Sequence, residues 1–292
     1  MSKRDLAARL LSLAPRGLVR SLRRARRGRC LTVLTYHRVM AIPADFPWDE
    51  DLVSATPREF ERQVAFVSRE YDVMTFREVA ESLDRDGRLP KRGLVITFDD
   101  GYRDNYEVAF PILRRAGATA TMLVAAGFIG ERRLFWWDRI ARIVKGAPAG
   151  ELRIEEPVRL TLELGGGNRQ GAARRLIREV KLVPDDEKEQ LIADLSARCG
   201  VPDEPPNERV TMTWDELREL DEAGIEIGGH SVNHPIFSNV SDERLRAEVA
   251  GSREMIGAAL GRPPVTFGSP GRGRIPPERQ REFTDTLGRI IE

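Results

Sequence analysis

Short apolar segments alternate along this chain with segments of helical periodicity, and this alternation limits the fold more than any other feature. Apolar runs at 30–39, 94–98, 119–126 and 225–229 are separated by segments whose apolar residues recur every three or four positions. Strands that alternate with helices favour a mainly parallel sheet covered by helices. We therefore expect an α/β fold, either barrel-like or open, with functional residues at the carboxyl ends of strands.

The region from about 131 to 209 has a different character. It is rich in Arg and Glu, and its periodicity at 168–182 and 184–200 is helical. We interpret it as a helical insertion. The predicted organisation is therefore a basic leader at 1–29, followed by one domain at 30–292 that contains the insertion.

The leader carries ten Lys and Arg residues against one acid, Asp5. Read as helices, it places leucines on one face and arginines on the other, which suits a membrane surface with anionic lipids. A solvated basic tail is the alternative. Pro15 interrupts the short apolar patch and arginines follow it, so the segment is a poor secretory signal. We expect a cytoplasmic protein, with peripheral contact at the inner face of the membrane as an option.

The remaining composition is that of an ordinary soluble globular protein. The chain is 41% hydrophobic and 32% charged, with a formal net charge of +1. Cys30 and Cys199 form no C-x-x-C pair, and two unpaired thiols indicate a reducing compartment. The basic run has no interleaved aromatic residues, which argues against a nucleic-acid partner.

Two adjacent carboxylates end the strand predicted in "GLVITFDDGYRD". Asp99 and Asp100 carry like charges, which repel each other and resist desolvation. One of them could cap the following helix, but a cap needs only one acid. A divalent cation would explain both, because it would neutralise one carboxylate as its ligand. The other could then stay ionised and act as a base on metal-bound water.

Two of the three histidines follow another predicted strand. His230 and His234 lie four residues apart in "GGHSVNHP", and imidazoles at that separation can converge on one cation. Alone the pattern is a weak signal, since chance surface histidines also produce it. Together with a carboxylate from a second strand end, it predicts a divalent metal site with open coordination positions.

At this point the chain resembles a known family. The segments "VITFDDGYRDNYEVAFPIL" and "MTWDELRELDEAGIEIGGHSVNHP" resemble the polysaccharide deacetylases, which include chitin, peptidoglycan and nodulation-factor (NodB-like) deacetylases. The resemblance covers roughly 31–130 and 210–270. It implies a distorted (β/α) barrel, here incomplete at the C-terminus if closing strands are missing. It also implies one divalent metal, zinc first and cobalt, manganese or nickel as alternatives.

The resemblance further implies a role for individual residues. Asp99 matches the catalytic base, and Ser231 matches the residue that orients the loop between the histidines. A backbone amide near Tyr102 would stabilise the oxyanion. The implied metal ligands are Asp100, His230 and His234, and the implied substrate-binding residues are Tyr102, Ser231, Pro270 and Arg272.

The chain departs from the family pattern in two places. In "FGSPGRGR" the central Pro270 is kept, but its flanking aromatics are replaced, and either Arg272 or Arg274 is left to supply the charge. The family's late Leu-x-His motif, which provides the general acid, has no counterpart after His234. His37 is the remaining histidine, and we predict that it is the acid. A packed histidine bonded to a backbone carbonyl is the alternative.

These observations predict a metal-dependent hydrolase that removes N-acetyl groups from an amino-sugar polymer or glycan intermediate. The bond it cleaves would be an amide bond other than a peptide bond. Two alternatives remain: a catalytically impaired, carbohydrate-binding descendant of the fold, and a deacylase of a lipid-linked sugar at a membrane surface. The predicted partners are an N-acetylated glycan and, through the leader, an anionic membrane.

Overall fold

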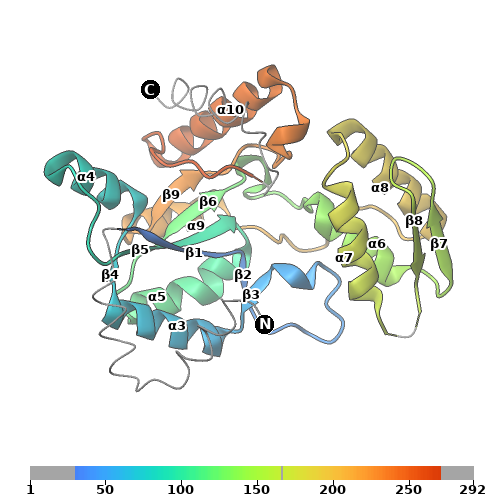
Figure 1. Cartoon of the computed structure of the whole chain (residues 1–292), viewed down its shortest axis with the longest axis horizontal. Coiled ribbons are helices and arrows are strands. Elements are labelled where there is room, and N and C mark those ends of the chain that lie inside the picture. Colours follow the sequence, from blue (N-terminus) through green and yellow to red (C-terminus); the bar gives the residue numbers. More distant parts are fainter. Residues whose placement is uncertain (1–29, 166, 271–292) are drawn as a thin grey trace, which may run out of the picture.

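The computed structural model of the chain describes residues 30–165 and 167–270 (Figure 1). The basic leader, Arg272 and Arg274 lie outside the described residues. None of the described helices combines the length and the apolar composition that crossing a membrane requires. Cys30 is exposed and Cys199 is buried, and both are free thiols.

A five-stranded parallel sheet forms the centre of the described chain, and it confirms the predicted α/β class. Its register pairs Asp100 with Val124 and Val124 with Gly229, so the carboxyl ends of the contributing strands lie at one level. Barrel closure is not seen within the described residues and stays a prediction. The strand order is β1 (Thr32–Tyr36), β5 (Gly93–Asp100), β6 (Thr121–Val124) and β9 (Glu226–Gly229), with β4 (Asp72–Val73) also paired to β5.

Helices cover the two faces of this sheet. The helix α10 (Asp242–Leu260) lies on the opposite face from α3 (Pro57–Glu70) and α5 (Phe110–Arg115) (Figure 1). Their apolar residues and those of the strands form one buried core, centred on side chains such as Phe60 and Phe98. The remaining helices beside the sheet are α4 (Phe76–Asp86) and α9 (Trp214–Glu222).

Three helices begin at a threonine cap. Thr56, Thr75 and Thr213 each accept a hydrogen bond from the backbone N–H three residues on, and a Glu at that position bonds back. This reciprocal arrangement satisfies two N–H groups that a helix start otherwise leaves unpaired. The local sequence therefore sets where these helices begin.

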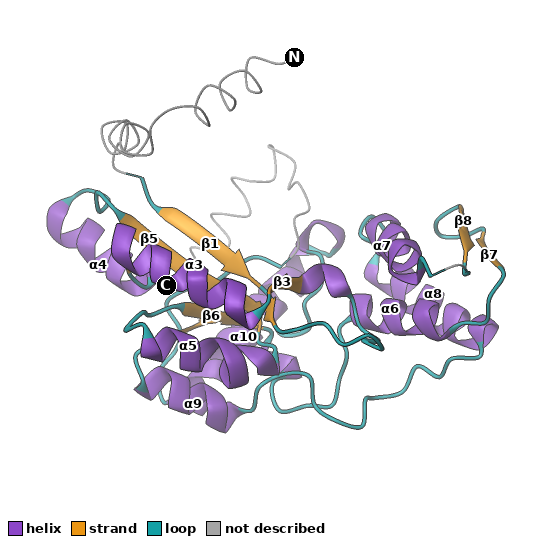
Figure 2. Ribbon diagram, turned by 90° about the horizontal axis from the view of Figure 1, so that it is seen from below, coloured by secondary structure: helices purple, strands orange, loops and turns teal. Residues whose placement is uncertain are grey.

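The insertion forms a separate lobe beside the sheet, at the right of both views (Figures 1 and 2). The prediction that it is helical is wrong in part, because an antiparallel hairpin stands between its helices. The two strands alternate exposed and buried residues, so their leucines and Ile154 enter the lobe's core. Its elements are α6 (Trp136–Gly146), β7 (Glu151–Ile154), β8 (Leu160–Glu163), α7 (Arg169–Val180) and α8 (Asp185–Cys199).

Candidate metal centre

The three predicted ligands meet at the carboxyl edge of the sheet. Asp100 is the last residue of β5, His230 directly follows β9, and His234 lies in the next turn. The Oδ1 atom of Asp100 is 3.6 Å from His230 Nε2 and 3.1 Å from His234 Nε2. All three residues are buried, and one potential ligand atom from each lies within 4.8 Å of the others.

The backbone at this site adopts unusual conformations. Asp100, Ser231 and His234 have φ angles of 75°, 69° and 54°, the left-handed region that non-glycine residues seldom adopt. Each such residue costs on the order of 1–3 kcal/mol and persists where surrounding structure holds it. Three such residues lie around one buried cluster. This indicates that the surrounding structure holds a strained backbone in place and thereby positions their side chains.

The donor set fits a divalent cation. Both carboxylate oxygens of Asp100 are buried, and apart from the two imidazoles no hydrogen-bond donor reaches them within the described part of the chain. His230 Nδ1 lies 2.8 Å from the carbonyl oxygen of Gly268. A carbonyl can only accept, so Nδ1 carries the proton and Nε2 presents its lone pair toward Asp100.

The electrostatics of the cluster agree with this protonation state. Burial, reinforced by the neighbouring His234, lowers the pKa of His230 to about 3, which keeps its imidazole neutral. Burial alone would raise the pKa of Asp100, but the nearby imidazoles outweigh it and hold that pKa at about 2. A buried carboxylate with two nitrogen donors is a set that zinc and similar divalent cations accept.

The two residues predicted to handle protons lie at the same edge of the sheet. Asp99 is partly exposed and precedes Asp100 on β5. His37 follows β1, which pairs with β5 in parallel register, and its charge acts on the pKa of both Asp100 and His230. The backbone of His37 is held at both ends: its N–H donates to Ser54 Oγ at 3.0 Å, and its carbonyl accepts from Asn105 Nδ2 at 2.8 Å.

Two predicted substrate contacts are corrected by burial. The hydroxyl of Ser231 is completely buried and accepts a hydrogen bond from the backbone N–H of His234 at 2.9 Å. It therefore shapes the loop and cannot touch a substrate. The Tyr102 side chain is also completely buried, so only its backbone remains available. Pro270 is buried at the end of the described chain, and Arg272 lies beyond it.

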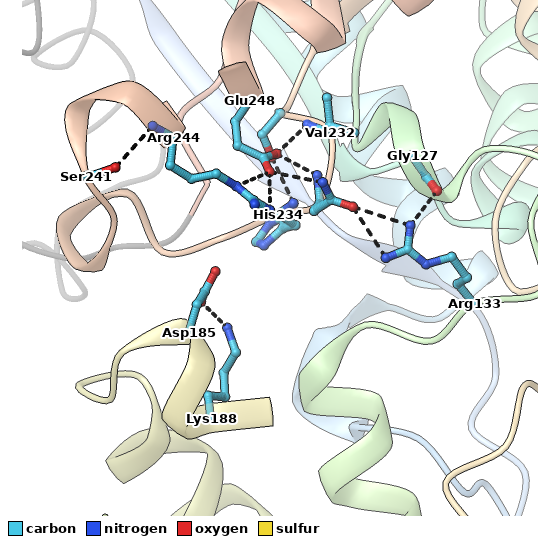
Figure 3. Close-up of polar contacts among 11 residues, drawn as sticks. Gly127, Arg133, Asp185, Lys188, Val232, His234, Ser241, Arg244 and Glu248 are labelled. Carbon is cyan, nitrogen blue, oxygen red and sulfur yellow. Dashed lines mark hydrogen bonds and ion pairs between the residues drawn. The ribbon is translucent and has the colours of Figure 1, made fainter. Parts of the chain in front are cut away.

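A carboxylate that our sequence analysis missed holds the histidine loop. Glu248, on α10, is 2% exposed and accepts the backbone N–H groups of Val232 and Asn233 at 2.9 and 2.7 Å. It also accepts a hydrogen bond from Asn233 Nδ2. Figure 3 shows that it pairs with Arg244 as well. The only sequence signal was an acid on the apolar side of a predicted helix, four residues after an arginine.

A second missed group links the insertion to the site. The Tyr102 hydroxyl donates to Asp138 Oδ2 at 2.8 Å and accepts from Trp137 Nε1 at 2.9 Å. The Arg38 guanidinium lies 4.6 Å from the centre of the Tyr102 ring. Burial raises the pKa of Asp138 to about 6. The insertion therefore contacts residues next to the candidate site and helps to hold them in place.

The insertion also places aromatic rings against a predicted ligand. The rings of Trp137 and Phe135 lie 4.7 and 5.8 Å from the imidazole of His234, in edge-to-face arrangements. Phe135 and Trp137 also stack on each other at 4.7 Å, and packing against this pair limits the rotation of His234. The aromatic stretch "FWW" was the available signal, but its sequence alone did not show what it faces.

The fold is similar to that of solved deacetylase structures. The Streptococcus pyogenes deacetylase PplD in complex with acetate superposes with a TM-score of 0.53, at 18% identity over 89% of this chain and 78% of that one. IcaB from Ammonifex degensii superposes with a TM-score of 0.51. The sequence identity is 20%, and the match covers 91% of this chain and 80% of that one. Identities this low establish the shared fold only.

The sequence comparison points to one family. The model of the polysaccharide deacetylase family matches residues 86–148 and 205–284, and together with the curated relatives this match indicates a polysaccharide deacetylase family protein. The segment that the family model leaves between these ranges, 149–204, contains most of the insertion.

Curated relatives match a shorter stretch. The putative polysaccharide deacetylase YxkH of Bacillus subtilis (strain 168) is 29% identical over 103 residues, which are 35% of this chain and 34% of that protein. The poly-beta-1,6-N-acetyl-D-glucosamine N-deacetylase of Staphylococcus aureus (strain MSSA476) is 31% identical over 90 residues, 30% of this chain and 31% of that protein. The chain thus matches about a third of the length of these relatives.

Proposed function

We propose that this protein is a metal-dependent hydrolase that removes N-acetyl groups from an amino-sugar glycan. The observation that carries the proposal is the buried cluster of Asp100, His230 and His234, in which a carboxylate faces two imidazole nitrogens. The family supports an amide hydrolase that acts on polysaccharide. A relative named as an N-deacetylase of poly-N-acetylglucosamine supports the acetylated sugar as substrate.

The three ligand candidates would hold one divalent cation, and zinc is our first choice. Bound there, such a cation would polarise the acetyl carbonyl and acidify the attacking water. His230 is prepared for this task, because the Gly268 carbonyl fixes its tautomer. Glu248 prepares His234 indirectly, by holding the two residues before it in the loop.

The chain itself would supply the proton transfers. Asp99 lies partly exposed beside the cluster and would take a proton from the attacking water. His37 would donate a proton to the departing amine, which is too poor a leaving group as an anion. The backbone N–H of Tyr102 donates to no carbonyl of the described residues, so it is available to the developing oxyanion.

Acetate release tests the proposal. Full-length protein would be stripped of metal, reloaded with zinc, cobalt, manganese or nickel, and given N-acetylglucosamine oligomers. We expect metal-dependent acetate release that His230→Ala abolishes. Glycan binding without acetate release under every metal would instead favour the catalytically impaired, carbohydrate-binding alternative.

We also propose a cytoplasmic location with peripheral membrane contact. This rests on the leader at 1–29, with ten basic residues against one acid. A deacylase of a lipid-linked sugar would need such contact, so vesicle binding bears on that alternative as well.

A further inference from the structure

A pocket of about 500 Å³ opens between the insertion and the histidine loop. We call it the insertion pocket. Its volume falls within the range of about 300–1,000 Å³ that is usual for small-ligand sites. One wall comes from the loop and the start of α10, through residues such as Asn233 and Arg244. The facing wall comes from the insertion, through Trp136 and the first turn of α8.

The pocket begins next to the candidate metal centre. Asn233, one of its lining residues, directly precedes His234 in the chain. Phe128 also lines it, and its ring stacks at 4.1 Å on Phe135, which in turn contacts the His234 ring. A ligand held at the metal could therefore extend into this pocket. Figure 3 shows Asp185 and Lys188 of the insertion across from Arg244 and His234.

Most charges around the pocket are already paired. Lys188 contacts Asp185, and Arg244 pairs with Glu248 at 2.9 Å. Arg139 pairs with Glu189 at 2.7 Å. Because carboxylates neutralise these positive charges, the pocket would bind a polyanion only weakly. It instead offers neighbouring donors and acceptors, the combination that sugar hydroxyl groups need.

One positively charged side chain of the pocket, Arg133, is held in place without a carboxylate partner among the described residues. The guanidinium of Arg133 lies 4.4 Å from the centre of the Phe128 ring and donates to the Gly127 carbonyl at 2.9 Å. Among the residues the structure describes, no carboxylate pairs with Arg133. Its exposed N–H groups are therefore preoriented donors beside an aromatic face.

We propose that the insertion pocket is a binding subsite for the sugar residue adjoining the one that is deacetylated. The ligand class is a neutral, hydroxyl-rich glycan, whose hydroxyl groups would meet Arg133, Asn233 and Asp186. This inference rests on the proposed function and deepens it. It assigns the insertion the role of selecting oligomers over single sugars.

Two pairs of matched variants test the subsite. Arg133→Leu removes the preoriented cation, and Arg132→Leu makes the same change at an exposed neighbour that does not line the pocket. Asp186→Ala removes a lining carboxylate, and Glu187→Ala removes the next, non-lining one. For each protein, kcat/KM on an N-acetylglucosamine pentamer is divided by kcat/KM on a small acetyl ester, 4-nitrophenyl acetate.

Loss of one hydrogen bond to a charged group corresponds to a change in affinity of about tenfold. We expect that ratio to fall about tenfold in Arg133→Leu and Asp186→Ala, through a higher KM, and to stay at the wild-type value in both controls. Calorimetry with the pentamer and metal-stripped protein should show weaker binding by the two pocket variants than by the wild type and the two controls. Pocket variants that behave like their controls in both measurements overturn the subsite.

The outcomes separate this inference from the function on which it rests. A wild-type protein that releases no acetate under any metal, yet binds the pentamer through Arg133, refutes the proposed activity and retains the subsite. A wild-type protein that deacetylates the pentamer equally well with and without Arg133 and Asp186 retains the activity and refutes the subsite. A marked preference for an anionic glycan of equal length would also refute it.

Discussion

The carboxylate of Glu248 accepts the backbone N–H of Asn233 at 2.7 Å, one residue before the candidate ligand His234. It accepts the N–H of Val232 through the same oxygen. A helix on one face of the sheet thus fixes the conformation of a loop whose ligand has a left-handed φ angle. The geometry of the candidate metal centre therefore depends on this contact as well as on the three candidate ligands.

Glu248→Gln should weaken metal binding without unfolding the protein. Glutamine keeps one acceptor oxygen but turns an NH₂ group toward donors, so the loop loses part of its support. Supporting residues of this kind typically contribute 10–100-fold to metal affinity, and we expect a loss of about that size. Chelator competition measures it. Glu254→Gln, at an exposed position of the same helix, is the control and should bind metal normally.

Asp99→Asn should keep the metal and lose activity, whereas Asp100→Asn and His234→Ala should lose most of the metal. Asp100 and His234 supply ligand atoms to the buried cluster, and Asp99 does not belong to it. Metal content after dialysis and acetate release are the two measurements. Equal loss of metal in the two Asp variants would show that the division between base and ligand is wrong.

His37→Ala should retain metal and fold but reduce turnover about 100-fold, the usual scale for general acid–base catalysis. The alkaline limb of the pH–rate profile should flatten too, because a general acid must be protonated to act. Circular dichroism and metal content establish that the variant is intact. Full activity without His37 would mean that another group, or water, protonates the leaving amine.

The buried Asp138 should make the protein less stable as the pH rises. Its pKa is raised by burial from 3.8 to about 6, so the folded state binds this proton more tightly than the unfolded state does. The stabilisation is fully present below about pH 4 and is lost as the pH rises through about 6. Its size is on the order of 3 kcal/mol, because one pKa unit corresponds to about 1.4 kcal/mol.

Urea unfolding measured between pH 4 and 7 tests this decrease in the free energy of unfolding with pH. Asp138→Asn cannot ionise, so the difference in free energy of unfolding between wild type and variant should shrink or reverse as the pH rises. If the free energies of unfolding of the two proteins changed in parallel with pH across this interval, the assignment to Asp138 would be wrong.

The leader should bind anionic vesicles in a salt-dependent manner. Each basic residue near such a surface contributes about 1 kcal/mol, and salt screens that contribution. Flotation with phosphatidylserine-containing vesicles should recover the full chain at low salt and lose it at high salt, whereas a chain lacking residues 1–29 should not float. Equal binding to neutral vesicles would exclude an electrostatic mechanism.

Much of the fold and of the site was accessible from the sequence, because the signals are local. Apolar runs predicted the strands, and the capping bonds with which Thr56 and Thr213 begin their helices span only three residues. Asp100 and His230 were found because each directly follows a predicted strand, and parallel strands bring such ends to one edge. The hairpin in the insertion was missed because its strands are four residues long, too short to outweigh the helical pattern around them.

What only the tertiary structure decided is which distant groups support the site. Glu248 reaches the histidine loop across 15 and 16 residues, and Asp138 meets Tyr102 across 36. Neither contact produces a recognisable periodicity or spacing in the sequence, because each depends on how distant segments pack together. The sequence by itself predicted the candidate ligands and the strands that carry them. Packing determined their protonation, their strained backbone and the pocket beside them, because burial and long-range hydrogen bonds arise only once the chain has folded.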